Sequence, residues 1–227
     1  MALPASDRHP RLGAARLYLV CEARPHGSDP EPLLEAALEG GTGMLELREK
    51  SPEDDSWLIE HSRPFREAAE RHRVPFILND RPDLVGDCGA DGVHVGQDDT
   101  PVTETRARLG DEHLIGLSTH SAAQLDAACS PPSQARPDYI SVGPVWETPT
   151  KEGRPAAGLE LIEHAAREAT LPWFAIGGIN LSNVGDVVAA GAERIVVVRA
   201  LRDASDPAAV ARGLREAIEA GAEVWRG

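Results

Sequence analysis

A repeated alternation of short apolar runs and helical patterns is the feature that most constrains the fold of this chain. Eight runs rich in Val, Ile and Leu start about 25 residues apart, the length of one strand, one helix and two loops. We predict strands at 16–22, 44–50, 75–80, 92–96, 114–120, 139–145, 173–179 and 194–200. We predict helices at 32–39, 53–72, 102–109, 122–128, 159–168, 181–190 and 207–219. A doubly wound sheet usually has fewer strands, so these units predict a single α/β domain, a (β/α)8 TIM barrel.

We place the barrel at residues 13–227 and expect residues 1–12 to form a short loose arm. The chain has 227 residues, 41% of them hydrophobic, which suffices for a core, and it lacks the run of roughly 18 apolar residues that a membrane span needs. Its formal charge of −14 argues against a protein that coats nucleic acid or anionic membranes. Small-molecule substrates remain, anionic ones included, wherever basic residues or a metal ion gather locally. No signal peptide is evident, and three irregularly spaced cysteines indicate free thiols in the cytoplasm. A homo-oligomer stays open.

Polar residues gather where the predicted strands end, which is where active sites lie in such barrels. Glu46, Arg48 and Lys50 share one face of the second strand, because side chains alternate along a strand. The third strand ends at Asn79 and Asp80, and Asp99 follows the fourth. Two carboxylates beside two basic residues suit a Mg²⁺–diphosphate complex, since Mg²⁺ takes one or two carboxylates plus phosphate oxygens.

The alternative for the two aspartates is that each caps the helix that follows it. Spacing alone leaves the two interpretations about even for Asp80 and Asp99. For the neighbouring Asp98 we favour a cap. His94 faces inward between Gly92 and Gly96, which favours a core histidine bonded to a neighbour, whereas His120 ends the fifth strand at a plausible active-site position.

Two further loops indicate anion binding. The sixth strand leads into a loop with Thr148, Pro149, Thr150 and Lys151, whose hydroxyls and lysine suggest a lid that closes on an anion. The loops after strands seven and eight often hold a phosphate in these barrels, and here they contain the pair Gly177–Gly178 and the step Val198–Arg199.

Six strand-end motifs in this order resemble the thiamine phosphate synthase family. The motifs are Glu46-Leu-Arg48-Glu-Lys50, Asn79-Asp80-Arg81, Gly92-Val-His94-Val-Gly96-Gln97-Asp98-Asp99, Gly116-Leu-Ser118-Thr-His120, Thr148-Pro149-Thr150-Lys151 and Ala175-Ile-Gly177-Gly178-Ile. Each is weak alone, but six in register over residues 16–207 are specific. The resemblance implies a Mg²⁺-assisted transferase that joins a pyrimidine diphosphate to a thiazole phosphate, carboxylated or not, and releases pyrophosphate.

The resemblance also implies roles for individual residues. Those implied to bind the pyrimidine diphosphate are Glu46, Arg48, Lys50, Asn79, Ser118 and Lys151; of these, Arg48, Lys50, Lys151 and Ser118 are implied to be catalytic. Asp80 and Asp99 would bind Mg²⁺. Those implied to bind the thiazole phosphate are Thr148, Pro149, Thr150, Gly178, Val198 and Arg199.

Two positions depart from the family pattern. Glu46 stands where Gln is usual, and an ionised carboxylate can only accept hydrogen bonds, whereas an amide can also donate them. We therefore expect altered pyrimidine affinity or an altered pH profile, and Glu46→Gln tests this. Arg199 stands where many members have Ser, and we interpret it as a variant side chain that also binds the phosphate.

Two alternatives of function remain at this point. One is the thiazole tautomerase branch of the same barrel family, which needs neither diphosphate nor metal and so has no use for Asp80, Asp99 and Lys151. The other is a non-catalytic barrel that binds thiamine phosphate, with Glu46 as the inactivating change.

Overall fold

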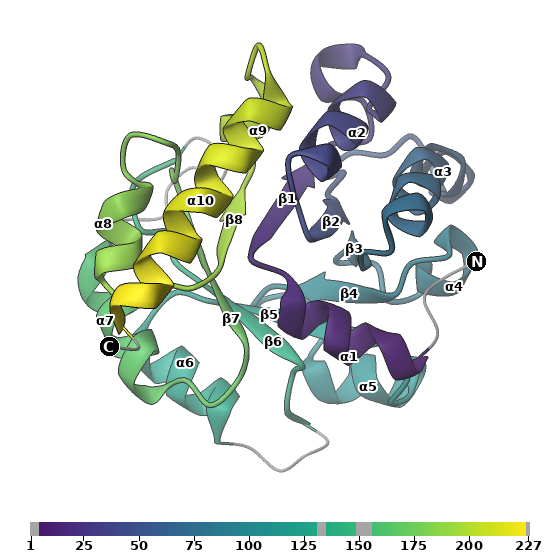
Figure 1. Cartoon of the computed structure of the whole chain (residues 1–227). Coiled ribbons are helices and arrows are strands. Elements are labelled where there is room, and N and C mark those ends of the chain that lie inside the picture. The colour runs from purple at the N-terminus through teal and green to yellow at the C-terminus, as the bar shows by residue number, and fades with distance from the viewer. Residues whose placement is uncertain (1–4, 131–134, 149–155, 226–227) are drawn as a thin grey trace.

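The computed structural model describes residues 5–130, 135–148 and 156–225, with side chains given from residue 9 to residue 221 of these ranges. Eight parallel strands form a closed barrel in sequence order, with helices around it (Figure 1). The strands are β1 (Leu17–Cys21), β2 (Met44–Leu47), β3 (Phe76–Asn79), β4 (Gly92–Val95), β5 (Leu114–Thr119), β6 (Tyr139–Val142), β7 (Trp173–Ile176) and β8 (Ile195–Val197). The predicted (β/α)8 barrel is confirmed.

The helices begin and end close to the predicted positions, with four additions. They are α1 (Ala5–Ala14), the 3-10 turn η1 (Pro25–Gly27), α2 (Glu31–Glu39), α3 (Asp55–His72), α4 (Val85–Cys88), α5 (Val102–Leu109), α6 (Ala122–Cys129), α7 (Gly158–Glu168), α8 (Val184–Ala189), α9 (Arg199–Arg202) and α10 (Pro207–Trp225). The sequence pattern did not predict α1, η1, α4 or α9. Three of these have four residues or fewer, too few to display a helical period.

Side-chain alternation along the strands separates the two parts of the core. On β2, Leu45 and Leu47 pack outward against the helices, while Met44 and Glu46 lie inside the barrel. The inner apolar layer combines Tyr18, Tyr139 and Phe174, whose ring centroids lie 5.5–6.2 Å apart with edge-to-face geometry. This aromatic layer fills the barrel interior, so the site lies above it rather than in a pore.

Within the described part of the amino-terminal segment, residues 5–14 form a helix instead of the loose arm that the sequence suggested. Residues Ala5–Ala14 form α1, and the Leu12 side chain is 1% exposed among the inner core residues. Arg194 donates to the Gly13 carbonyl (3.1 Å), and His9 Nε2 lies 2.9 Å from Asp138 Oδ1. Both contacts attach α1 to residues just before strands β8 and β6, so this helix covers the amino-terminal end of the barrel.

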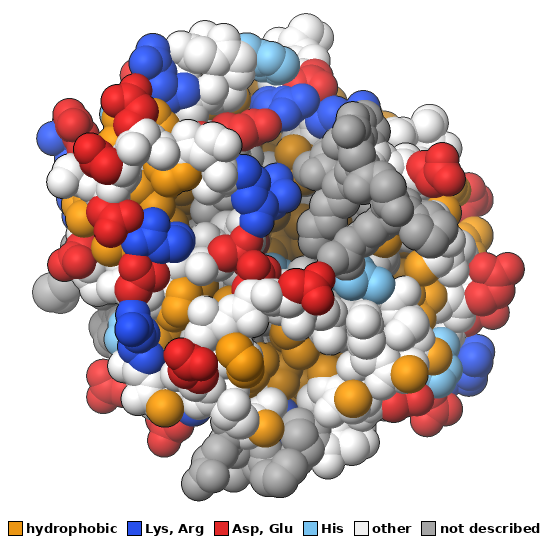
Figure 2. All heavy atoms as spheres, turned by 180° about the vertical axis from the view of Figure 1, so that it is seen from behind, with side chains coloured by type: hydrophobic (Ala, Val, Ile, Leu, Met, Phe, Trp, Pro, Cys, Tyr) orange, Lys and Arg blue, Asp and Glu red, His pale blue; other side chains and the backbone are white. Residues whose placement is uncertain are grey.

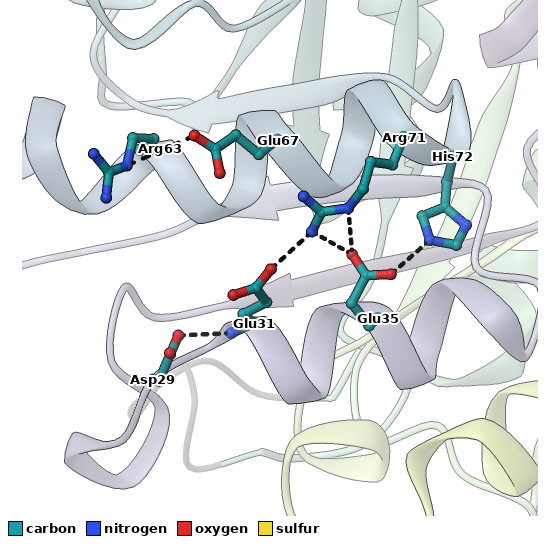
Figure 3. Close-up of polar contacts among 7 residues, drawn as sticks. All are labelled: Asp29, Glu31, Glu35, Arg63, Glu67, Arg71 and His72. Carbon is teal, nitrogen blue, oxygen red and sulfur yellow. Dashed lines mark hydrogen bonds and ion pairs between the residues drawn. The ribbon is translucent and has the colours of Figure 1, made fainter.

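Outside the barrel, α2 and α3 are joined by a cluster of charged side chains (Figure 3). Arg71 on α3 donates to Glu31 (3.0 Å) and to Glu35 (2.6 Å) on α2. His72 Nε2 lies 2.8 Å from the second oxygen of Glu35. The cluster fixes two neighbouring helices to each other at a distance from the barrel mouth.

Candidate active site

The polar residues at the strand ends surround one cavity of about 630 Å³ at the carboxyl-terminal mouth of the barrel. Figure 2 shows basic and acidic side chains side by side around a central hollow, with hydrophobic side chains inside it. The predicted site residues that line the cavity are Glu46, Arg48, Lys50, Asn79, Asp80, Asp99, Ser118, Thr148, Gly178, Val198 and Arg199. Pro149, Thr150 and Lys151 lie outside the described residues. Eleven residues that the sequence proposed from seven strand ends therefore share one space.

Asp80 is held in the cavity by its backbone and by its neighbours. Its φ of +58° lies in the left-handed region that few residues other than glycine adopt. One carboxylate oxygen pairs with Lys50, and the other accepts from Asn79 Nδ2 at 3.2 Å. Burial raises the pKa of Asp80, the Lys50 pair opposes this, and the nearby Asp99 raises it further, so the net pKa lies above the ordinary value. Two carboxylates that affect each other in this way form a site that favours a cation between them.

Helix capping does not explain the aspartates. Asp99 accepts a hydrogen bond from the Gly96 backbone N–H at 2.8 Å, which folds it back toward the end of β4. Helix α5 begins after Pro101 and α4 after Leu84, and neither start has a side-chain cap. The capping alternative is therefore wrong for Asp80 and Asp99. The N-cap residue of α5 is Pro101 and not Asp98, which lines the cavity.

The opposite side of the cavity is formed by the loops after β7 and β8. Gly177 and Gly178 have φ values of +114° and +71°, and a Cβ on Gly177 would lie 2.5 Å from the Pro144 Cα. Only glycine fits this turn, which brings the backbone to the cavity wall without a side chain in the way. Val198 precedes α9 and Arg199 is its exposed first residue. Because β3 and β7 lie on opposite sides of an eight-stranded barrel, this wall faces Asp80 across the cavity.

The floor of the cavity holds hydrogen-bonding groups that the sequence analysis did not select. Tyr18 and Ser141 line the cavity on the inward faces of β1 and β6, and Gln97 donates to the Ser118 carbonyl at 2.6 Å. His94 is buried and lies 3.0 Å from Ser118 Oγ, so the predicted core histidine bonded to a neighbour is confirmed. His120 also lines the cavity, with Nδ1 2.6 Å from the Gly143 carbonyl oxygen. A tyrosine within an apolar strand was the one available signal for Tyr18.

Two kinds of feature are absent from the described residues. No group of three or more His, Cys, Asp and Glu side chains in those ranges is arranged to hold a metal ion. No helix in the same ranges is long and apolar enough to cross a membrane.

Comparison with known proteins places the chain in a family. The family model described as "Thiamine monophosphate synthase" matches residues 17–201, which is nearly the whole barrel. The chain belongs to this family. The thiamine-phosphate synthase of Arthrobacter sp. (strain FB24) is 47% identical over 231 residues, covering 93% of this chain and 97% of the relative. That of Thermobifida fusca (strain YX) is also 47% identical, over 215 residues, covering 93% of this chain and 96% of the relative.

Solved structures agree at the level of the fold and the family. The thiamine phosphate pyrophosphorylase from Pyrococcus furiosus aligns with a TM-score of 0.81 at 26% identity, covering 94% of this chain and 98% of that one. A 3-hexulose-6-phosphate synthase at 18% identity and a TM-score of 0.62 shares the fold alone. The predicted family and activity are confirmed: the chain is an enzyme, a transferase of thiamine phosphate synthesis. Nothing in these comparisons supports the thiazole tautomerase or the non-catalytic barrel that binds thiamine phosphate.

Proposed function

We propose that this cavity is where the pyrimidine-methyl group passes from its diphosphate ester to the ring nitrogen of thiazole phosphate. The observation that carries the proposal is the division of one cavity into two unlike walls. Arg48, Lys50, Asp80 and Asp99 follow strands β2 to β4, while the glycine turn and Arg199 follow β7 and β8. A diphosphate with its counter-cation suits the first wall, and a phosphate monoester suits the second.

On the first wall, Arg48 and Lys50 would hold the diphosphate. Both follow β2 on the inward face, and the Lys50 side chain is half exposed at the cavity rim while it pairs with Asp80. A fixed positive charge at the departing oxygens stabilises the transition state more than the bound ester, because negative charge grows there as the bond breaks. By the family resemblance, Lys151 would add a further cation.

Asp80 and Asp99 would hold Mg²⁺, and the donor set fits that ion. Mg²⁺ prefers one or two carboxylates and completes its coordination with water and phosphate oxygens. Burial and the proximity of Asp99 raise the pKa of Asp80, the electrostatic condition that a bound cation relieves. When bound, Mg²⁺ supplies positive charge to the diphosphate. Lys50 now occupies one Asp80 oxygen, and this ion pair keeps the carboxylate oriented toward the cavity.

On the second wall, the backbone of Gly178 and Val198 would approach the thiazole phosphate, and Arg199 would add a charged side-chain contact. Arg199 is exposed at the first position of α9, which gives its guanidinium the reach to follow a phosphate. Thr148 at the start of the neighbouring loop lines the same space. The two phosphate groups would thus bind at opposite sides, with the reacting atoms between them.

The reaction follows from this arrangement. The bond between the methylene carbon and the diphosphate oxygen breaks, with its electron pair moving to that oxygen. The cation that forms is stabilised by the amino group of the pyrimidine, and the nitrogen lone pair of the thiazole makes the new carbon–nitrogen bond. A carboxylated thiazole loses CO₂ in the same sequence. The attacking nitrogen needs no general base, so the residues serve to bind, orient and exclude water.

The test is direct formation of product. Purified protein receives the pyrimidine diphosphate and the thiazole phosphate with Mg²⁺ or with EDTA, and thiamine phosphate is measured as fluorescent thiochrome after oxidation. We expect product with Mg²⁺ and none with EDTA. Absence of product from protein with a native circular dichroism spectrum would overturn the proposal. A cytoplasmic location and a homo-oligomer stay predictions of the sequence.

A further inference from the structure

A chain of hydrogen bonds crosses the barrel interior from Glu46 on β2 to Ser118 on β5. The Tyr18 hydroxyl donates to Glu46 Oε2 and lies 3.2 Å from the Tyr139 hydroxyl. His94 Nδ1 lies 3.2 Å from the Tyr139 hydroxyl, and His94 Nε2 lies 3.0 Å from Ser118 Oγ. Five strands thus supply one continuous connection between two residues that line the same cavity.

The packing around this chain leaves it little freedom. Tyr18 and Tyr139 are at most 1% exposed, and Glu46, His94 and Ser118 are buried as well. A Cβ on Gly116 would lie 2.2 Å from the Tyr139 ring and 2.4 Å from His94 Nδ1, so the glycine makes the space that these two rings occupy. A buried donor left without an acceptor is costly, so the geometry favours an arrangement in which each donor of the chain finds an acceptor within it.

The direction of the first links follows from the donors available. An ionised carboxylate can only accept hydrogen bonds. With Glu46 in that form, the Tyr18 hydroxyl donates its single proton to Glu46. Burial and then the charge of Glu46 raise the pKa of Tyr18, which keeps that proton on the phenol. The Tyr18 oxygen can then only accept from Tyr139, whose own proton is used in turn.

The directions of the remaining hydrogen bonds follow from assigning donors and acceptors in the same way. With its proton given to Tyr18, Tyr139 can only accept from His94 Nδ1, so a neutral His94 carries its hydrogen on Nδ1. His94 Nε2 is then an acceptor, and Ser118 donates to it. Ser141 Oγ lies 3.4 Å from His94 Nε2 and 3.5 Å from Ser118 Oγ. Because Ser118 is the nearer donor to Nε2, Ser141 is left to donate to Ser118. Ser118 is left with a lone pair, and no proton, for a cavity ligand.

We propose that the Glu46 carboxylate fixes the direction of this chain and thereby makes Ser118 a hydrogen-bond acceptor toward the cavity. Tyr18, Tyr139 and His94 are positioning residues that transmit the polarity. Which ligand atom meets Ser118 rests on the proposed function: an acceptor suits an N–H, such as the amino group of the pyrimidine, and repels a phosphate oxygen. Glutamine at position 46 would lift the constraint, because its amide can donate to Tyr18 or accept from it.

The tautomer of His94 tests the proposal without any substrate. Long-range ¹H–¹⁵N correlation spectra of protein labelled with ¹⁵N-histidine distinguish the protonated ring nitrogen from the bare one. The His94 signal among the eight histidines is identified by its loss in His94→Asn and by through-bond correlation to its own backbone. Near neutral pH we expect the Nδ1–H form in the unaltered protein. The Nε2–H form or the imidazolium would overturn the proposal.

Two variants test the role of the carboxylate, with a matched control. Glu46→Gln and Tyr18→Phe each remove the constraint, so we expect a measurable Nε2–H population in both. Glu49→Gln removes the same charge three residues further on, where Glu49 contacts the Ser51 backbone outside the cavity, and should leave the tautomer unchanged. An unchanged tautomer in the first two variants, or an equal change in the control, would contradict the proposal.

The tautomer spectra test the direction of the hydrogen-bond chain and the product assay tests the proposed function, so one proposal can be contradicted while the other is upheld. An Nδ1–H tautomer in a protein that makes no thiamine phosphate would leave the polarity established and the proposed function wrong. A fully active protein with the Nε2–H tautomer would mean the opposite. If either variant fails to fold, as judged by its amide fingerprint spectrum, the tautomer of the unaltered protein still decides the direction of the chain.

Discussion

Asp80 combines a rare backbone conformation with a carboxylate that faces both a cation and a second carboxylate. Its φ of +58° is tolerated far better by Asp and Asn than by most other residues, since their short side chains bond locally in the left-handed region. Strain of this kind persists where the surrounding structure over-determines it, commonly at functional sites. The conformation therefore agrees with the proposed metal-binding role, and it determines which substitution tests that proposal cleanly.

Asp80→Asn should keep the backbone and remove the charge. We expect kcat/KM for thiamine phosphate formation to fall on the order of 100-fold at fixed Mg²⁺, because one of the two proposed Mg²⁺ ligands loses its negative charge. Steady-state rates over a Mg²⁺ titration measure this. Asp83→Asn is the control, since Asp83 pairs with Arg81 outside the cavity and should change the rate less than about twofold. Equal losses in the two variants would remove Asp80 from the site.

Ser118→Ala separates two kinds of hydrogen bond at the cavity. If Ser118 only accepts, the variant should bind inorganic pyrophosphate with Mg²⁺ about as tightly as the unaltered protein does. The KM for the pyrimidine diphosphate should rise by about 2–10-fold, the worth of one hydrogen bond from an N–H group. Calorimetry and initial rates give the two values. Pyrophosphate binding weakened as much as the pyrimidine diphosphate would show that the hydroxyl donates to phosphate.

Single residues differ in how well the sequence could predict them. The strand-end residues, Lys50 and Asp80 among them, were predictable because a barrel brings all its strand ends together, whatever the details of packing. The link from Tyr18 to Tyr139 was not, since these residues are more than one hundred positions apart and meet only across the closed barrel. Hydrogen-bond partners inside a barrel depend on its stagger, which periodicity does not encode.

At the scale of elements, the contact between α2 and α3 depends on ionised Glu35 (Figure 3). Burial raises its pKa, but hydrogen bonds from His72 and Arg71 outweigh that effect, so the pKa of Glu35 lies below its ordinary value. A carboxyl group with a lowered folded pKa adds stability above its unfolded pKa of about 4.3, and this stability is lost as the pH falls through the folded value. The helix pair should therefore loosen in acid.

Arg71→Ala tests this dependence. We expect the free energy of unfolding in urea to fall by about 0.5–1 kcal/mol near pH 7, since the ion pairs are partly exposed to water. The difference from the unaltered protein should shrink as the pH is lowered toward 3, because Glu35 becomes protonated as the pH falls through its folded pKa. Arg63→Ala, on the same helix, removes only an exposed pair at 3.7 Å and should cost less than about 0.5 kcal/mol. A loss that is equal at both pH values would point to packing of the arginine stem instead.

The strands themselves were predictable and their ends were not. All eight predicted strands are present, but β2 ends at Leu47, before Arg48 and Lys50, and β3 ends at Asn79, before Asp80. Those residues leave the ladder and turn into the cavity, as the Asp80 backbone shows. The alternating pattern in the sequence continues through such a turn, so the sequence alone predicts a strand that is too long.

At the scale of the whole molecule, the two ends of the barrel have different tasks, and only one of them was foreseen. The carboxyl-terminal mouth is open and polar, whereas the other end is covered by α1. The α1 sequence contains Pro10 and few apolar residues, so it shows no apolar stripe and does not predict a packed helix. Covering a narrow barrel end requires little apolar surface: Leu12, with Ala15 just after the helix, is enough to join the inner core.

Leu12→Ala should therefore destabilise the protein far more than a change in a loose arm would. The side chain is 1% exposed beside Tyr18 and Met44 in the inner core, and its removal leaves a cavity under the aromatic layer. We expect a loss of about 2–4 kcal/mol in the free energy of unfolding, measured in urea. Leu181→Ala removes the same atoms from a side chain that is 51% exposed and should cost less than about 1 kcal/mol. Comparable losses in the two variants would mean that α1 does not close the barrel.

Because the aromatic layer carries Tyr18 beneath Glu46, a loosened α1 should also raise the KM for the pyrimidine diphosphate before the chain unfolds.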